Sequence, residues 1–320
     1  MNSNQKIFHD RKAWPENVRI YPPCLIQSGV FTASQSTKQY EDEKLLYTDK
    51  SLIGIVTKYT AEKTLGMPQL IVLLELIDMM KYCHLYDSYE FSTGRLLERL
   101  KQKRTGSAYS NLNRLLEDLA KLRINVRSEF TDTGKCETSE TSLFNFIETS
   151  EFAYKSGQKE DIEAEEGRAV CCFQFSDLMI ELLQTKYLSS VHTKILHECG
   201  KSPITIWLYI FYSTHGANAN KTYEYTTYKL AVTSGLEKGY SSVKNKLKSQ
   251  LAHRIKIAIA KLKSLHVFQK VLFIKTTDKT DTYYAYSMKV IMHRFAYDTE
   301  KILSNTALED RASMFEQLLT

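Results

Sequence analysis

The strongest chemical signal in the sequence is a run of positive charge that contains no negative charge. Residues Gly239 to Thr277 include no Asp or Glu, while the 320-residue chain has a formal net charge of +6. The cations of the run are Lys244, Lys246, Lys248, Arg254, Lys256, Lys261, Lys263, Lys270 and Lys275. Clustered cations release counterions when they neutralise phosphates, which drives sequence-independent binding to nucleic acid. A solvated helix face would mix both signs, so the run predicts contact with a phosphate backbone.

Within this run, residues 243–265 have the spacing of a helix with one apolar face. The apolar face is made of Leu247, Leu251, Ile255, Ala258, Leu262 and Leu265. The candidate DNA-contacting residues of this helix are Lys246, Ser249, Gln250, His253, Arg254, Lys256 and Lys263. A helix that enters the major groove needs one buried face and one face of polar and basic side chains. Lys270 and Lys275 follow on a predicted hairpin, from which they are expected to reach adjacent phosphates.

A second helix of the same kind is predicted at residues 107–122. Its leucines, Leu112, Leu115, Leu116, Leu119 and Leu122, fall on one stripe. The candidate contacts are Ser107, Ser110, Asn111, Asn113, Arg114 and Lys121. Arg pairs with guanine and Asn with adenine, and Ser can hold a phosphate or a base edge. Glu117 also points outward, where it either accepts from cytosine or repels DNA, and an ordinary surface helix remains the alternative.

Motifs for other chemistry are missing from the sequence. It has no G-x-x-x-x-G-K-[ST] phosphate loop, no G-x-G-x-x-G after a strand and no G-x-S-x-G nucleophile turn. The eight histidines never form the pair, separated by one apolar residue, that holds the metal of a rolling-circle nickase. We therefore expect no enzymatic activity and no cofactor.

Cysteine usage and hydropathy indicate the cellular compartment and whether a metal is bound. None of the six cysteines forms a C-x-x-C pair, which favours reduced thiols. His192, His197 and Cys199 lie close in sequence but lack the four-ligand spacing of a structural zinc site, so no metal is expected. No window of 18 residues is apolar enough to span a membrane, and the N-terminus has no secretory signal. The expected location is the cytoplasm.

The two candidate helices occupy equivalent places in a repeated order of elements. The first half is expected to contain a helix at 67–86, a strand at 89–91, a helix at 93–101 and the helix at 107–122, followed by strand candidates at 124–130, 142–154 and 169–175. The second half is expected to contain helices at 177–185 and 203–215, a strand at 223–225, a helix from 226 or 227 to 234, the helix at 243–265, and a hairpin at 267–290. Leu119-Ala120-Lys121-Leu122 also matches Ile259-Ala260-Lys261-Leu262.

This order of helix, strand, helix, helix and hairpin is that of a winged helix, a variant of the helix-turn-helix. The predicted fold class is α+β and mostly helical, with two tandem winged-helix domains. We expect an N-terminal extension at 1–45, a first domain at 46–175 with an acidic loop at 156–167, and a second domain at 176–320 that ends in C-terminal helices.

A family resemblance appears around the first candidate helix. Phe91-Ser92-Thr93-Gly94-Arg95-Leu96-Leu97, then Thr105-Gly106-Ser107-Ala108-Tyr109-Ser110-Asn111-Leu112, then Leu115 and Leu119, resemble plasmid replication initiators of the replication initiator protein A and TrfA-like group. The likeness extends in plan over residues 50–300. The family often has Arg or Lys directly after the motif Tyr, where this chain has Ser110.

The resemblance implies a tandem winged-helix protein that binds repeated double-stranded DNA sites, called iterons, at a plasmid origin. It also implies melting of nearby A·T-rich DNA, recruitment of the host helicase and its loader, and a homodimer away from DNA. Two alternatives stay open from the residues alone. One is a winged-helix transcriptional regulator, and the other is a protein-interaction scaffold that does not bind DNA.

Overall fold

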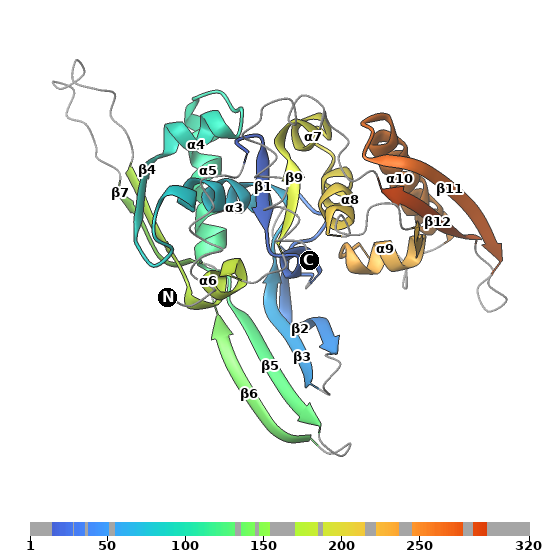
Figure 1. Cartoon of the computed structure of the whole chain (residues 1–320), viewed down its shortest axis with the longest axis horizontal. Helices are drawn as coiled ribbons and strands as arrows, with labels where there is room; N and C mark the ends of the chain where they lie inside the picture. Colours follow the sequence, from blue (N-terminus) through green and yellow to red (C-terminus); the bar gives the residue numbers. More distant parts are fainter. Residues whose placement is uncertain are drawn as a thin grey trace, which may run out of the picture. The chain divides into compact units, whose positions relative to one another are not determined.

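The computed structural model has an α+β fold, as predicted from the sequence (Figure 1). It describes residues 15–27, 29–35, 38–50, 55–131, 136–144, 147–153, 170–184, 188–214, 222–236, 245–277 and 284–292. The chain divides into two compact units. The first unit is Met1–Lys12 with Ser36–Thr185, and the second is Ala13–Gln35 with Lys186–Thr320.

The first unit is built on three helices and a small antiparallel sheet. In chain order these are α3 (Met67–Met79), β4 (Tyr89–Ser92), α4 (Thr93–Arg99), α5 (Gly106–Ala120), β7 (Ile147–Ala153) and β8 (Val170–Phe175). The order of strands in the sheet is β4-β8-β7. Pro68 stands in the first turn of α3, where its missing N–H leaves no bond unmade, and a short 3₁₀ turn at Met80–Tyr82 follows this helix. The apolar helix predicted at 67–86 is therefore present but shorter.

A second sheet in the first unit was not predicted. It has the order β2-β3-β5-β6, formed by β2 (Lys38–Lys50), β3 (Ile55–Thr64), β5 (Ile124–Thr131) and β6 (Cys136–Phe144). The hairpin that directly follows α5 belongs to this sheet, where Ile55 of β3 pairs with Phe130 of β5. The hairpin that completes the sheet of β4 is β7–β8 instead. The β5–β6 hairpin is thus an insertion between α5 and the hairpin expected to follow it.

The boundary between the units also differs from the predicted one. Helix α6 (Asp177–Gln184) belongs to the first unit, although residues from 176 onward were assigned to the second domain. Ser176 caps this helix as predicted, because its Oγ accepts from the N–H of Met179 at 3.3 Å. The acidic segment at 156–167 joins β7 to β8 in the chain and lies outside the described residues, as do the C-terminal helices expected at 298–319.

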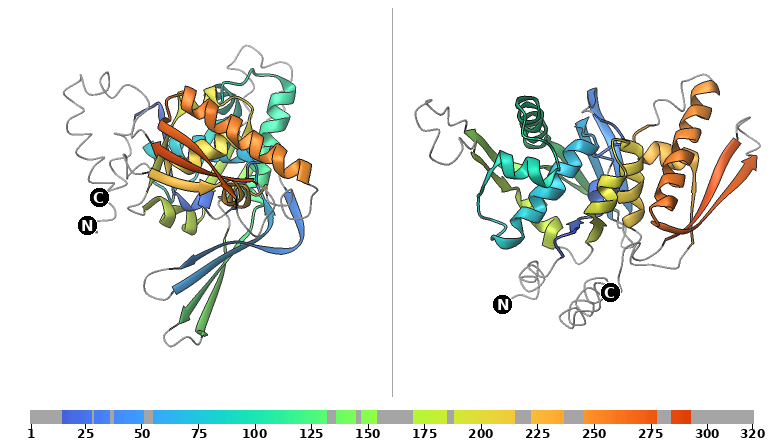
Figure 2. Two further views of the ribbon diagram at one scale, coloured as in Figure 1. Left: turned by 90° about the vertical axis from the view of Figure 1, so that its right-hand side faces the viewer. Right: turned by 90° about the horizontal axis from the view of Figure 1, so that it is seen from above.

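The second unit repeats the plan of the first. After β9 (Ser189–His192) and α7 (Thr193–Glu198) come α8 (Pro203–Ser213), β10 (Thr222–Thr226), α9 (Thr227–Thr233), α10 (Asn245–Ser264), β11 (Phe268–Thr277) and β12 (Tyr284–Met292). The order of strands, β10-β12-β11, matches β4-β8-β7 of the first unit element by element. Figure 2 shows α10 together with the hairpin β11–β12, both in orange to red.

The N-terminal segment is part of the second unit rather than an extension. Strand β1 (Val18–Tyr21) pairs antiparallel with β9, so that Val18 faces His192 and Tyr21 faces Ser189. The short helix α2 (Cys24–Gln27) packs against α8. The predicted extension at 1–45 is therefore corrected, because residues 38–50 form β2 and residues 15–35 complete the second unit.

Each unit has one largely buried helix, which is leucine-rich in the first unit (α3) and aromatic in the second (α8). Leu70, Leu73 and Leu76 of α3 are fully buried, as are Trp207 and Tyr212 of α8. Phe211 stacks on Trp207, and Tyr212 meets Phe268 edge to face, which ties α8 to the first residue of β11. Among the described residues, no helix combines the length and the apolar character that crossing a membrane requires.

Candidate nucleic-acid interface

Helix α5 has the divided surface that its sequence predicts. The five leucines of the stripe, Leu112, Leu115, Leu116, Leu119 and Leu122, are all buried. Ser107, Ser110, Arg114 and Lys121 are exposed, and Asn111 and Asn113 are half-buried. All six candidate contacts of this helix therefore have at least part of their surface open to solvent.

Two cations on the outer face of α5 bond to neighbours on the same helix. Arg114 Nη2 donates to Asn111 Oδ1 at 2.9 Å. Lys121 Nζ forms an ion pair with Glu117 Oε2 at 2.8 Å, one helical turn away. The hydrogen bond and the negative charge of Glu117 raise the pKa of Lys121. The outward Glu117 thus partly neutralises the cation at the end of the helix.

The turn that precedes α5 is fixed by a small set of contacts. Thr105 caps the helix, because its Oγ1 accepts from the N–H of Ala108 at 3.3 Å. Arg104 Nη2 pairs with Glu98 of α4 at 2.6 Å. The hydroxyl of Tyr109 lies close over Gly94 of α4, since a Cβ at Gly94 would stand 3.2 Å from it. These contacts therefore hold the start of α5 against α4.

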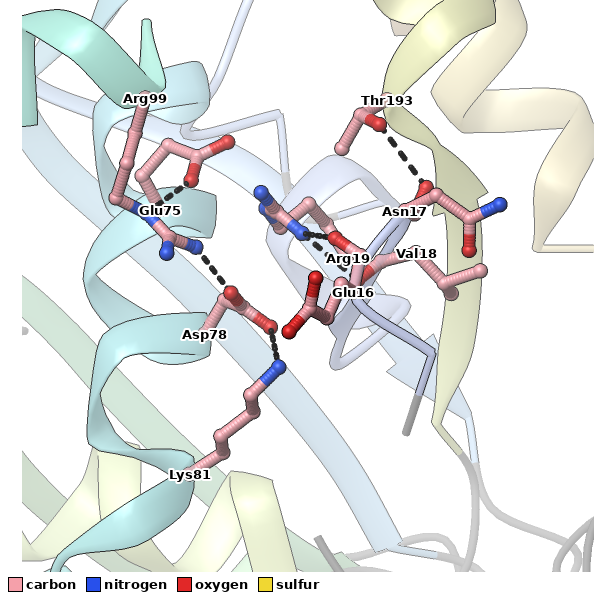
Figure 3. A network of polar contacts seen from close by, with 9 residues as sticks. All are labelled: Glu16, Asn17, Val18, Arg19, Glu75, Asp78, Lys81, Arg99 and Thr193. Carbon is pink, nitrogen blue, oxygen red and sulfur yellow. Dashed lines mark hydrogen bonds and ion pairs between the residues drawn. The ribbon is translucent and has the colours of Figure 1, made fainter. Parts of the chain in front are cut away.

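Helix α3 holds α5 and α4 through polar bonds that are largely buried. Gln69 uses its Oε1 to accept from the N–H of Gly66 at 3.2 Å and its Nε2 to donate to Asp118 of α5 at 3.0 Å. Arg99 of α4 bonds both Glu75 and Asp78 of α3, and Lys81 pairs with Asp78 at 3.2 Å (Figure 3). Buried charges are tolerated when they are paired in this way, and removing one partner is costly.

Helix α10 also shows the predicted division, without a single acidic residue. Leu251, Ile255, Ala258, Leu262 and Leu265 are buried as predicted, and Ile259 is buried with them. The exposed candidates are Gln250, His253, Arg254, Lys256 and Lys263. Lys246 and Ser249 lie on the same helix, where their side chains are outside the described residues. Most of the described side chains on the face away from the core are therefore polar or basic.

The surrounding elements of the second unit fix the position of α10. It packs against α8 and α9, and its end leads directly into β11. His266, with φ +57°, makes the left-handed turn between helix and strand. Lys270 of β11 is exposed, and Lys275 lies further along the same strand, with a side chain outside the described residues.

Some exposed residues of α10, Ile257 and Lys261 among them, were not among the predicted contacts. Ile257 has 55% of its surface exposed, which is unusual for a β-branched apolar side chain. At 100° per residue it lies on the same face as His253 and Ala260, both exposed. Lys261 is exposed and follows one turn later. Helical spacing alone places both residues on this face.

The described thiols and histidines of the second unit do not form a metal site. The described residues contain no group of three His, Cys, Asp or Glu side chains that could hold an ion. Burial raises the pKa of Cys199 to about 12, and His192 uses Nδ1 to accept from the N–H of Lys194 at 3.2 Å. His192 therefore serves as the N-cap of α7.

No protein-family model and no curated protein sequence matches the chain. Among solved structures it is similar to a crystal structure of domains 2 and 3 of RctB, with 12% sequence identity and a TM-score of 0.55, over 85% of this chain and 98% of that one. A second structure of RctB domains 2–3 gives 12% identity and a TM-score of 0.51 over 88% and 100% of the two chains. A crystal structure of the Pi initiator protein in complex with iteron DNA gives 10% and 0.48 over 87% and 98%.

The similarity to RctB domains 2 and 3 extends over both units of the chain and over almost all of that structure. The chain therefore shares the fold of RctB domains 2 and 3. At 12% identity the comparison concerns the fold alone, so the roles of individual residues depend on the geometry described above.

Proposed function

We propose that the chain is a plasmid replication initiator that binds repeated double-stranded DNA sites through two winged-helix units. In this proposal α5 and α10 are the recognition helices, and the hairpins β7–β8 and β11–β12 are the wings. The protein acts in the cytoplasm as a binding protein without a catalytic site. It promotes melting of the origin and recruits the host helicase and its loader, and it forms a homodimer away from DNA.

The observation that carries this proposal is the acid-free, exposed face of α10. Gln250, His253, Arg254 and Lys256 are all exposed on a helix whose 20 residues include no carboxylate. A helix of that charge, followed by a hairpin that carries Lys270, fits a major groove and its flanking phosphates. The equivalent place of α5 in the first unit supports a second recognition helix, since both units share one order of elements.

The assignment to replication rests on a different observation. The motif around Tyr109 resembles that of replication initiators, and the small residue of the motif at Gly94 leaves room for the hydroxyl of Tyr109, which a Cβ there would approach to 3.2 Å. Two recognition helices in one chain favour direct repeats, because tandem units would read neighbouring turns of one duplex. We therefore expect repeats of about 20 base pairs, which corresponds to two helical turns.

The proposal is tested by selecting binding sites from a random duplex pool with the full chain. The selected DNA is then used to measure affinity at several salt concentrations for the wild type, Arg114→Glu with Lys256→Glu, and the control Lys201→Glu. The control reverses one exposed cation between α7 and α8. We expect direct repeats and a steep salt dependence. The salt slope of the double variant should be smaller by about 1 for each phosphate that it no longer neutralises, while the slope of the control should be unchanged.

The outcomes separate the three candidate functions. A single palindrome in the selected DNA would indicate a transcriptional regulator. If the chain binds no duplex, the remaining candidate function is that of a protein-interaction scaffold. If direct repeats are selected, a plasmid that carries them beside its replication origin and lacks an initiator gene should replicate only when the wild-type chain is supplied.

A further inference from the structure

The N-terminal segment of residues 15–35 supplies hydrogen bonds that two helices of the second unit would otherwise lack. The last four carbonyls of a helix have no partner within that helix. Ile210 has such a carbonyl near the end of α8, and the hydroxyl of Tyr21 donates to it at 2.6 Å. Tyr21 is fully buried, so the bond is shielded from water.

The end of α9 is held by the same segment. The N–H of Ala33 donates to the carbonyl of Ser234 at 2.8 Å. The next residue, Gly235, has φ +70°, and a Cβ at this position would stand 2.5 Å from Cγ2 of Thr32. Glycine is therefore required at 235 both for its backbone conformation and for the close approach of Thr32.

Further bonds fix the segment at both of its ends. The indole N–H of the buried Trp207 donates to the carbonyl of Phe31 at 3.2 Å. The carbonyl of Asn17 accepts from the N–H of Thr193 at 2.8 Å and from its Oγ1 at 3.1 Å (Figure 3). The segment thus bonds to α7, α8 and the end of α9.

We propose that residues 15–35 are a positioning element for α10, and that their detachment disables DNA binding by the second unit. The inference rests on the proposed function. Helix α10 packs against α8 and α9, and these are the two helices whose C-terminal carbonyls the segment bonds. Detachment leaves these carbonyls without partners and opens the site that Phe31 fills, so α8 and α9 lose the positions that hold α10. In sequence the segment is separated from α7–α10 by the whole first unit.

Two glycines of the second unit provide a matched test. Gly235→Ala adds a methyl group against Thr32 at a left-handed position. Gly200→Ala adds one at φ +68°, where nothing lies within 4 Å, and so carries the backbone strain alone. The footprint of Gly235→Ala on the selected duplex should lose one half of the site, the same half that Lys256→Glu weakens. The footprint of Gly200→Ala should keep both halves. Thr32→Gly in the Gly235→Ala background removes the steric overlap and should restore the missing half.

Docking of the segment is measured separately from DNA binding. The chain has two tryptophans, so the indole N–H of Trp207 can be followed by NMR in the absence of DNA. We expect fast exchange of this proton with solvent in Gly235→Ala and slow exchange in the wild type and Gly200→Ala. Tyr21→Phe, which removes only the bond to Ile210, is a milder second variant and should give intermediate exchange and a partial loss of the same half-footprint.

The results distinguish the two proposals. If exchange at Trp207 becomes fast in Gly235→Ala or Tyr21→Phe while the complete footprint remains, the positioning role is wrong and the proposed function stands. The positioning role is also wrong if Gly200→Ala weakens the half-footprint as strongly as Gly235→Ala. If the wild type protects no duplex at all, the proposed function itself is wrong.

Discussion

The two candidate recognition helices occupy the same place in two similar units, yet their outer faces differ. On α5, Arg114 bonds Asn111 and Lys121 pairs with Glu117, so that the cations have partners within the helix. Helix α10 itself contains no acidic residue. The comparison suggests a division of labour, in which α10 supplies most of the electrostatic affinity and α5 contributes chiefly through the geometry of its side chains.

Reversing charges on each helix tests this division most strongly. We expect Lys256→Glu with Lys263→Glu to weaken duplex binding by about two orders of magnitude near physiological salt, because two phosphate contacts become repulsive. The matched pair on α5, Arg114→Glu with Lys121→Glu, should weaken it by about one order of magnitude, since Lys121 is already neutralised by Glu117. Titrations of labelled duplex at several salt concentrations measure both. Equal losses for the two pairs would contradict the division.

Exposed Ile257 predicts a specific base contact on α10. An apolar side chain in the major groove can cover the methyl group of thymine. Replacing single thymines of the selected duplex by uracil should weaken the wild type by about fourfold at one position, corresponding to about 0.8 kcal/mol for one buried carbon. Ile257→Ala should bind the thymine and uracil duplexes equally. Leu272→Ala, which alters an exposed apolar residue of β11, should keep the difference.

A smaller effect is expected from the acid on α5. Glu117→Gln removes a negative charge from the outer face and releases Lys121, so binding should strengthen by about two- to fivefold at low salt. The gain should fade as salt is raised. Glu90→Gln makes the same change of charge on an exposed residue of β4 and should leave affinity unchanged. A weaker complex for Glu117→Gln would instead indicate that Glu117 accepts a hydrogen bond from a base.

Much of the repeated plan could be predicted from helical periodicity and caps. The leucine stripe of α5, the apolar face of α10 and the stop of α9 at Gly235 all appear where local patterns placed them. These features depend on residues three or four apart, which a sequence displays directly.

The unpredicted parts depend on contacts between distant residues. Strand β1 pairs with β9, although the first unit separates them in the sequence, and β3 pairs with β2 on one side and with β5, which follows α5, on the other. In the sequence, Tyr21 and Trp207 look like ordinary core residues. No neighbouring residue indicates that Tyr21 donates to a carbonyl of α8 or that Trp207 donates to the carbonyl of Phe31. For the candidate interface, the exposure of the candidate side chains that the structure describes followed from periodicity, whereas the pairing of Lys121 with Glu117 was found only in the structure.

Two glycines of the first unit test how α5 is held against α4, and their effects are expected to be the smallest. At Gly106, the first residue of α5, a Cβ would meet nothing within 4 Å, so Gly106→Ala should raise the free energy of unfolding by about 0.5–1 kcal/mol. At Gly94 the same methyl group would lie 3.2 Å from the hydroxyl of Tyr109 and 3.4 Å from Cζ of Arg104. Gly94→Ala should therefore gain less stability, or lose some, and shift α5.

Thermal unfolding gives the stability of each glycine variant, and affinity for the selected duplex reports the position of α5. In the Gly94→Ala background, Tyr109→Phe removes the hydroxyl that the new methyl group meets. Both quantities should then move towards those of Tyr109→Phe alone. If Gly94→Ala and Gly106→Ala change stability and affinity equally, the contact of Tyr109 with α4 does not set the position of α5. Helix α5 would then be held by its leucine stripe and by the bond between Asp118 and Gln69.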